Sequence, residues 1–231
     1  MIWRCTAKWE YKLVDKSEVK VYRSCCSSIL TEISDILKEQ HGIVTQFTLV
    51  GSGARNLVTV NGNGQYDLDY NLEILKLSEN MDLHRLKETI RKVLNQVVGG
   101  TFFTDGQDST SVLTSNLCFR GEPNKHFSFD IAIVKKNNNG TLCRLIHNKN
   151  QHSFGKQGQY TWCEVPNSHD VLEKSKKIKN KNGWLEVRDR YVKLKNLYLR
   201  KNDCEHPSFI VYVEAVNQVY NEIYGNGGRQ K

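Results

Sequence analysis

The 231-residue sequence has few prolines, only 3, and no apolar run long enough to cross a lipid bilayer. Its first residues, Met1–Cys5, lack the apolar stretch of a signal peptide. With 39% hydrophobic and 25% charged residues, the composition is typical of an ordinary folded protein. These features exclude a membrane protein, a fibrous protein and a secreted disulfide scaffold, and they predict a cytoplasmic location.

The seven cysteines lack the pattern of a disulfide framework or a zinc site. Their number is odd, their spacing is irregular, no C-x-x-C pair occurs, and Cys25 is adjacent to Cys26. The chain is also long enough to bury a core without such staples. We therefore expect reduced thiols that mostly pack in the core.

The net charge of +8 is concentrated in one stretch of the chain. Residues 174–201, here called the basic block, hold 11 basic residues and two acidic ones, so the rest of the chain is close to neutral. A run of like charge is most often a solvated helix face, and an electropositive surface for phosphate groups is the alternative. The charge as a whole favours anionic partners.

The spacing of apolar residues divides the chain into two regions. Strands are expected over residues 43–50, 66–75, 111–119, 126–134 and 142–146. Helices are expected over residues 17–40, 81–98, 170–180, 184–200 and 208–224. The pattern predicts an α+β fold, with a core over residues 1–165 and a helical C-terminal subdomain over residues 166–231.

The strand Tyr66–Ile74 has an unusual face. Its side chains alternate, so Asp67, Asp69, Asn71 and Glu73 lie on one side and apolar residues on the other. Same-face neighbours on a strand lie within about 8 Å of each other. Two carboxylates that close are unfavourable unless a cation joins them, and Mg²⁺ prefers such oxygen ligands.

Two other segments carry candidate chemistry. Gly51-Ser52 directly follows an apolar strand, where backbone N–H groups and the Ser52 hydroxyl can hold phosphate oxygens, although the lysine of a Walker loop is missing. Asp130 lies in an otherwise apolar and aromatic strand, Phe127–Ile133. Alone it would be read as a solvent-facing acid, but with the Asp67 and Asp69 pair a third carboxylate supports two-metal chemistry.

In this order, strand then Gly51-Ser52, Asp67-Leu68-Asp69 and a later Asp130, the segments resemble the nucleotidyltransferase superfamily of the DNA polymerase β type. The resemblance covers about residues 43–134 and implies a small mixed β-sheet flanked by helices. Two features depart from the family pattern. Ser52 and Asp67 lie 15 residues apart, which is longer than usual, and Gly53–Asn56 replaces the usual small-residue turn. Arg55 could therefore contact phosphate or cap a turn.

The resemblance implies a reaction and a metal site. The reaction is magnesium-dependent transfer of a nucleoside monophosphate, with AMP favoured, from an NTP to a hydroxyl acceptor, with release of pyrophosphate. Asp67 and Asp69 would hold two Mg²⁺ ions, for which Mn²⁺ could substitute. Asp130 would bind the catalytic metal and orient or deprotonate the attacking hydroxyl.

It also implies a nucleotide site, with ATP the favoured nucleotide. Gly51 and Ser52 would bind the β- and γ-phosphates, and Arg55 is a further candidate. Lys193 of the basic block is the helical lysine that would approach the triphosphate, with a solvated side chain as the alternative. Tyr160 and Trp162 could stack on a base, although packing in the core is more typical of such aromatics.

The acceptor stays open between RNA, protein and a small molecule, and no membrane partner is expected. A second class of function is a non-catalytic nucleotide- or RNA-binding module on a degenerate transferase fold. The presence of all three carboxylates counts against that second class.

Overall fold

The computed structural model describes residues 10–62, 64–77, 81–117, 127–148, 159–166, 168–203 and 206–225. The chain divides into two units, which we treat separately: a sheet unit of residues 15–58 and 64–166, and a helical unit of residues 1–14, 59–63 and 167–231. Cys5, Cys118, Cys204 and the first residue of the strand predicted over 126–134 lie outside the described residues. Within the described ranges, no helix has the length and apolarity that a membrane crossing needs.

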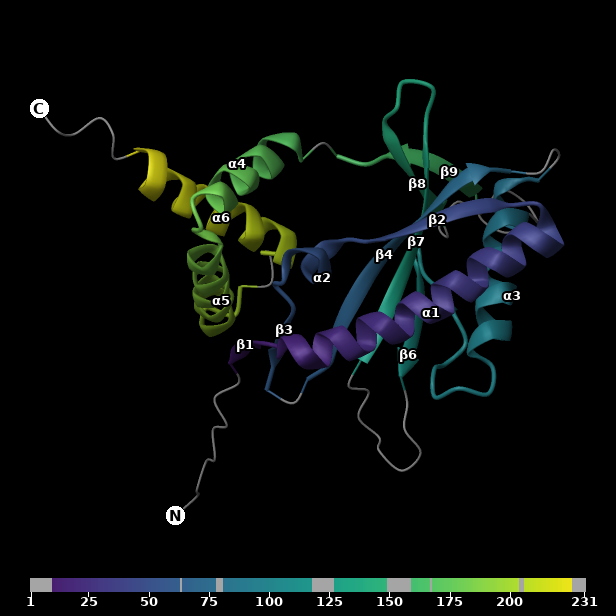
Figure 1. The fold of residues 1–231 in the computed structure, drawn as a ribbon, viewed down its shortest axis with the longest axis horizontal. Helices are drawn as coiled ribbons and strands as arrows, with labels where there is room; N and C mark the ends of the chain where they lie inside the picture. Colours follow the sequence, from purple (N-terminus) through teal and green to yellow (C-terminus); the bar gives the residue numbers. More distant parts are fainter. Residues whose placement is uncertain are drawn as a thin grey trace, which may run out of the picture. The chain divides into compact units, whose positions relative to one another are not determined.

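The sheet unit is built on a seven-stranded mixed sheet (Figure 1). The strands run in the order β2 (Val44–Leu49), β4 (Tyr66–Lys76), β7 (Phe127–Lys136), β6 (Leu113–Leu117) and β5 (Gln107–Asp108). Strand β8 (Leu142–Asn148) also pairs with β7, and β9 (Gln159–Glu164) pairs with β8. Only β4 and β7 are parallel among these pairs of described strands, and the others are antiparallel. The predicted α+β class and mixed sheet are confirmed.

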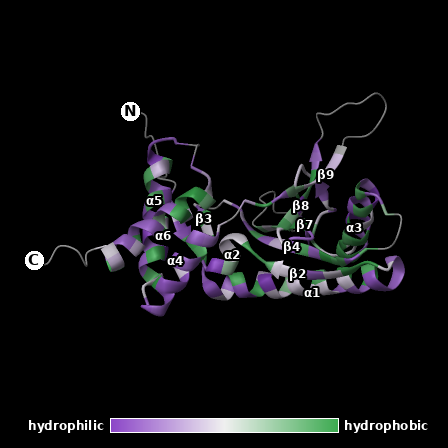
Figure 2. Cartoon of the chain, turned by 90° about the horizontal axis from the view of Figure 1, so that it is seen from above, coloured by the Kyte–Doolittle hydropathy of each residue, from purple (hydrophilic) through white to green (hydrophobic). Residues whose placement is uncertain are grey.

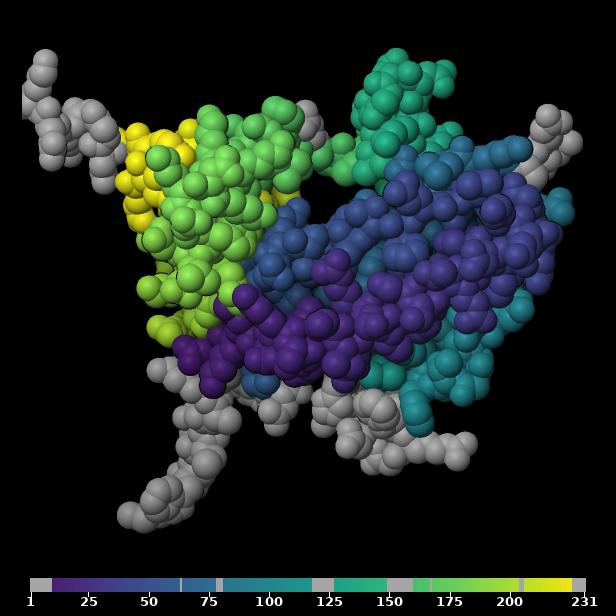
Figure 3. All heavy atoms as spheres, viewed as in Figure 1, coloured from purple at the N-terminus to yellow at the C-terminus, as the bar shows by residue number. Residues whose placement is uncertain are grey.

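Two helices of the sheet unit, α1 (Lys16–His41) and α3 (Leu83–Val98), pack against each other. Helix α1 begins at Asp15, whose side chain accepts a hydrogen bond from the Ser17 N–H at 2.7 Å. It ends at Gly42, whose φ of +66° suits glycine. Both helices carry hydrophilic and hydrophobic residues (Figure 2), and α1 crosses the sheet unit in the space-filling view (Figure 3).

One face of the sheet is buried against α1. On β4 the buried residues alternate with more exposed ones, so that Tyr66, Leu68, Tyr70 and Leu72 point to the helix side. Tyr22 of α1 stacks on Phe127 of β7 with ring centroids 4.4 Å apart. Because α1 covers this side, the residues that alternate with the apolar ones, including the predicted carboxylates, lie on the opposite face.

The helical unit contains α4 (His169–Asn180), α5 (Trp184–Arg200) and α6 (Ser208–Tyr224). It also contains β1 (Tyr11–Leu13), paired with β3 (Thr59–Asn61). Asn196 of α5 holds β1, because its side chain accepts from the Tyr11 N–H at 2.7 Å and donates to the Tyr11 carbonyl at 3.0 Å. Strand β1 therefore packs against α5, and the domain boundary at residue 165 stays a prediction.

The described cysteines divide evenly between core and surface. Cys26 and Cys143 are buried, whereas Cys25 and Cys163 are exposed, and all four are free thiols. Burial raises the pKa of Cys26 to about 12, so this thiol stays protonated at neutral pH. The expectation of core packing therefore holds for two of the four.

Candidate active site

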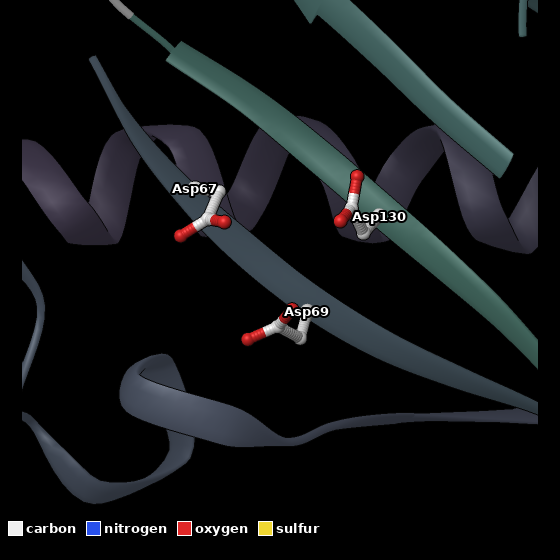
Figure 4. Close-up of side chains that lie close together, drawn as sticks. All are labelled: Asp67, Asp69 and Asp130. Atoms are coloured by element: carbon white, nitrogen blue, oxygen red, sulfur yellow. The ribbon is translucent and has the colours of Figure 1, made fainter. Parts of the chain in front are cut away.

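The structure brings the three predicted carboxylates together on neighbouring strands. In the parallel β4–β7 pair Asp69 lies directly opposite Asp130, and Asp67 lies two residues before Asp69 on the same face. One carboxylate oxygen from each of the three lies within 4.8 Å of the others (Figure 4). In the same view α1 passes behind the two strands, on the side away from the carboxylates.

The electrostatics of this cluster favour a cation. Burial, together with the negative charges of Asp67 and Asp130, raises the pKa of Asp69 to about 6. Burial also raises the pKa of Asp130. The folded chain therefore disfavours full ionisation of the cluster. Three converging carboxylates are the hard oxygen donors that Mg²⁺ and Mn²⁺ prefer, so the residues fit such an ion.

Thr114 on β6 is a residue of this site that sequence reasoning missed. It pairs with Asp130 across the antiparallel β6–β7 ladder, and its hydroxyl donates to Asp130 Oδ1 at 2.6 Å. This hydrogen bond opposes the upward shift that burial gives to the pKa of Asp130. Only the strand register shows which residue faces Asp130, and a sequence alone does not provide it.

Gly51 packs against the carboxylates. It opens the short helix α2 (Gly51–Arg55) with a φ of +61°, and a Cβ at this position would overlap the carboxylate of Asp69. The Val50 N–H donates to the Asp69 carbonyl at 2.8 Å, which fixes this approach. The sequence prediction that a glycine lets the backbone come close to the site thus has a steric basis.

The remaining nucleotide-site residues are distributed over both units. Ser52 and Arg55 lie on α2, both half-buried, and the charge of Arg55 is one of the influences that lower the pKa of Asp69. Lys193 is exposed on α5 in the helical unit. Contact of Lys193 with the triphosphate stays a prediction.

The strand register assigns other residues to one face or the other. Val134 shares a face with Asp130, four residues away on β7, and Arg144 of β8 lies opposite Val134. Arg144 therefore lies on the carboxylate face, and its charge is another influence that lowers the pKa of Asp69. Sequence reasoning missed Arg144 for the same reason as Thr114.

The aromatic pair on β9 is oriented away from the carboxylates. His147 lies three residues beyond Arg144, on the helix face, and Tyr160 pairs with His147 and stacks on its ring at 4.2 Å. Two residues further on β9, Trp162 faces the same way and lies under the Lys135 ammonium group at 4.7 Å. This placement on the helix face agrees with the packing that is more typical of such aromatics, and stacking of Tyr160 or Trp162 on a base stays a prediction.

Comparison with known proteins gives matches at the level of structure. No family model and no curated protein sequence matches the chain. The Vibrio cholerae cyclic AMP-GMP synthase DncV aligns with a TM-score of 0.56 and 8% identity, over 79% of this chain and 61% of DncV. The chain has the polymerase β-like nucleotidyltransferase fold.

Escherichia coli MS115-1 CdnC bound to ATP aligns with a TM-score of 0.54 and 16% identity, over 94% of this chain and 63% of CdnC. A DncV structure with nonhydrolyzable GTP aligns with a TM-score of 0.58 and 8% identity, over 92% of this chain and 68% of that one. The chain spans about three fifths of the length of the first two proteins. At these identities the likeness establishes the fold.

Proposed function

We propose that this chain is a metal-dependent nucleotidyltransferase, which transfers a nucleoside monophosphate from an NTP to a hydroxyl acceptor and releases pyrophosphate. The observation that carries the proposal is the convergence of Asp67, Asp69 and Asp130 within 4.8 Å, on the sheet face opposite α1 in a nucleotidyltransferase fold. A degenerate binding module would have no need to keep three mutually repelling carboxylates in a partly buried cluster.

Asp67, Asp69 and Asp130 would hold two divalent cations, with Mg²⁺ favoured and Mn²⁺ able to substitute. When bound, these cations would neutralise the charge that develops on the triphosphate and the leaving pyrophosphate. The close approach of Gly51 to Asp69 supports a phosphate site at α2, where the backbone and the Ser52 hydroxyl would contact the β- and γ-phosphates. Arg55 and Lys193 are the proposed basic contacts of the triphosphate.

The chain's own chemistry is positioning and proton transfer. The acceptor oxygen forms a bond to the α-phosphorus while the bond to the bridging oxygen of pyrophosphate breaks, and the pyrophosphate carries away the electron pair. The Asp130 carboxylate would orient the attacking hydroxyl and accept its proton, while its Oδ1 accepts a hydrogen bond from the Thr114 hydroxyl. The Thr114 bond also fixes the orientation of the Asp130 carboxylate.

We propose a second nucleotide as the acceptor. DncV is described as a cyclic AMP-GMP synthase, and one of its structures that resembles this chain, with a TM-score of 0.54, holds the linear intermediate pppA(3′,5′)pG. RNA, protein and other small molecules are the competing acceptors. ATP and GTP are the first donors to test, because both occur with these neighbours.

The charge of the helical unit agrees better with a small acceptor than with a long nucleic acid. Residues 167–225 contain 8 acidic residues beside the 11 basic ones of the basic block. Several of these acids meet the block directly, as in the Lys176–Glu173 pair at 2.7 Å and the Arg190–Glu222 pair at 2.8 Å. In the folded unit, acidic side chains therefore neutralise part of the positive charge of the basic block.

Products distinguish the acceptors. Wild-type chain is incubated with each α-labelled NTP and Mg²⁺, alone and with added total RNA or protein, and the label is followed by thin-layer chromatography and gel electrophoresis. We expect a phosphatase-resistant nucleotide product that forms without added macromolecule. Label in RNA or protein would reassign the acceptor, and NTP binding without pyrophosphate release would favour the non-catalytic module.

A further inference from the structure

The carboxylate face of the sheet continues beyond the three aspartates. Asn71 follows two residues after Asp69 on β4, and in the parallel register it lies opposite Ala132 of β7. Arg144 of β8 lies on the other side of β7, opposite Val134. Asn71 and Arg144 therefore flank the Ala132–Val134 stretch of β7 on the same face as the aspartates. Glu73, which lies across Val134 from Arg144, is paired with Lys136 at 3.3 Å.

Both flanking side chains have a buried polar atom that lacks a hydrogen bond. Asn71 Oδ1 and Arg144 Nε are each buried, and neither has a hydrogen-bond partner among the residues that the structure describes. Buried polar atoms in folded proteins are nearly always paired, because an unpaired one forfeits its hydration without compensation. Asn71 Oδ1 is an unpaired acceptor and Arg144 Nε is an unpaired donor on the same face. Together they indicate a ligand that donates a hydrogen bond to Asn71 and accepts one from Arg144.

The hydrogen-bonding character of Asn71 Oδ1 and Arg144 Nε indicates the kind of ligand. A phosphate group offers acceptors to Arg144 but no donor to Asn71 at neutral pH. The edge of a nucleobase carries donors and acceptors side by side, as in the N6 amino group and N7 of adenine, and arginine and asparagine are the side chains that typically pair with such edges. Asn71 is the next residue after Asp69 on the same face of β4, so this patch adjoins the metal site.

We propose that Asn71 and Arg144 form a base-reading subsite, which recognises the nucleobase edge of a nucleotide bound at the carboxylates. The inference rests on the proposed function, because it requires a nucleotide at that site. It assigns to these two residues the selection among nucleotides, whereas the aspartates and α2 hold the metal and phosphates that all nucleotides share.

The test compares ligands with and without a base. Calorimetry of the full chain with Mg²⁺ measures ATP, GTP, CTP, UTP and inorganic tripolyphosphate. Asn71→Ala and Arg144→Met should each weaken binding of the preferred nucleotide by about ten-fold, which is the loss expected for one base contact. The affinity of each variant for tripolyphosphate should stay within about two-fold of the wild-type value. The matched control is Arg85→Met, which replaces an exposed arginine on α3 and should leave the affinities for the nucleotide and for tripolyphosphate unchanged.

Thermal melting checks that each variant folds, and Arg144→Lys serves as a second variant that keeps the positive charge but lacks Nε. Loss of nucleotide selectivity in Arg144→Lys, with unchanged tripolyphosphate binding, would support base reading. An equal loss of tripolyphosphate and nucleotide in Arg144→Met would overturn it in favour of a phosphate contact. Unchanged selectivity in all variants would overturn it as well, while metal-dependent tripolyphosphate binding would still uphold the proposed function. Failure of wild-type chain to bind any of these ligands would overturn both.

Discussion

The hydroxyl of Thr114 donates a hydrogen bond of 2.6 Å to Oδ1 of Asp130 across the β6–β7 pair. This contact lowers the pKa of Asp130 against the effect of burial, which raises it. It also orients the carboxylate that we assign to the attacking hydroxyl. A residue of the neighbouring strand β6 thus orients the Asp130 carboxylate and modifies its pKa.

Thr114→Val tests this support. Without the hydroxyl the pKa of Asp130 should rise, so the acidic limb of the pH–rate profile should move to higher pH. The rate on the plateau should fall by about ten-fold, as expected for a hydrogen bond to a charged group. Thr114→Ser keeps the donor and should behave like the wild type. A Thr114→Val profile that overlays the wild-type curve would show that the contact is only structural.

The metal-free protein should lose stability as the pH rises. Because the pKa of Asp69 is raised from 3.8 to about 6 in the folded chain, the unfolded chain ionises first. The free energy of unfolding should therefore decrease as the pH rises from about 4 to about 6, and the deficit should persist above that range. A bound divalent cation should remove it.

Asp69→Asn should then stabilise the apo protein at pH 7 by about 3 kcal/mol and abolish its metal binding. The gain should vanish below about pH 4, where both states are protonated. Urea unfolding in EDTA at several pH values measures this, and Asp35→Asn, an exposed acid on α1, is the control. A destabilised Asp69→Asn protein would mean that this carboxylate holds the fold together.

Gly51→Ala should damage the site more than the fold. A methyl group there would overlap the Asp69 carboxylate and would also strain a backbone with a φ of +61°. Gly140→Ala is matched, since its φ is +78° and nothing lies within 4 Å of an added Cβ. Both changes should cost about 1–2 kcal/mol of stability from backbone strain. Only Gly51→Ala should also weaken Mn²⁺ binding in a titration, and equal Mn²⁺ affinities in the two variants would contradict this role.

Reversal of charge in the basic block tests the size of the acceptor. With a nucleotide as acceptor, changing Lys176, Lys177 and Lys179 to Glu should leave turnover within about two-fold, because no long phosphate backbone is neutralised. Turnover is measured from 50 to 200 mM salt. A large loss of activity in the triple variant, together with a steep salt dependence in the wild type, would instead indicate a nucleic-acid acceptor.

Sequence reasoning predicted the parts of the fold that local pattern controls. Helix α5 was predicted at its observed bounds and α1 to within a residue, since apolar spacing and the stop at Gly42 are local signals. Strand β1 has three residues and β5 two, too few for any periodicity to show.

For the candidate site, too, the sequence predicts what depends on local pattern and does not predict what depends on strand pairing. Asp67 and Asp69 share a face because of alternation within one strand, which the sequence contains. The partners Thr114 and Arg144 depend on which strand pairs with β7 and in which register, and that is decided by packing across distant segments. The face that Tyr160 occupies depends in the same way on its pairing with β8, which the sequence does not contain.

The central claim is that Asp67, Asp69 and Asp130 support metal-dependent nucleotidyl transfer. The most direct measurement is pyrophosphate release from ATP and GTP by wild-type chain, with Mg²⁺ and with EDTA, beside Asp67→Asn, Asp69→Asn and Asp130→Asn variants that melt at or above the wild-type temperature. We predict release that requires Mg²⁺ and falls at least about a hundred-fold in each variant. Release that persists in EDTA, or that survives in folded Asp69→Asn protein, would contradict the account.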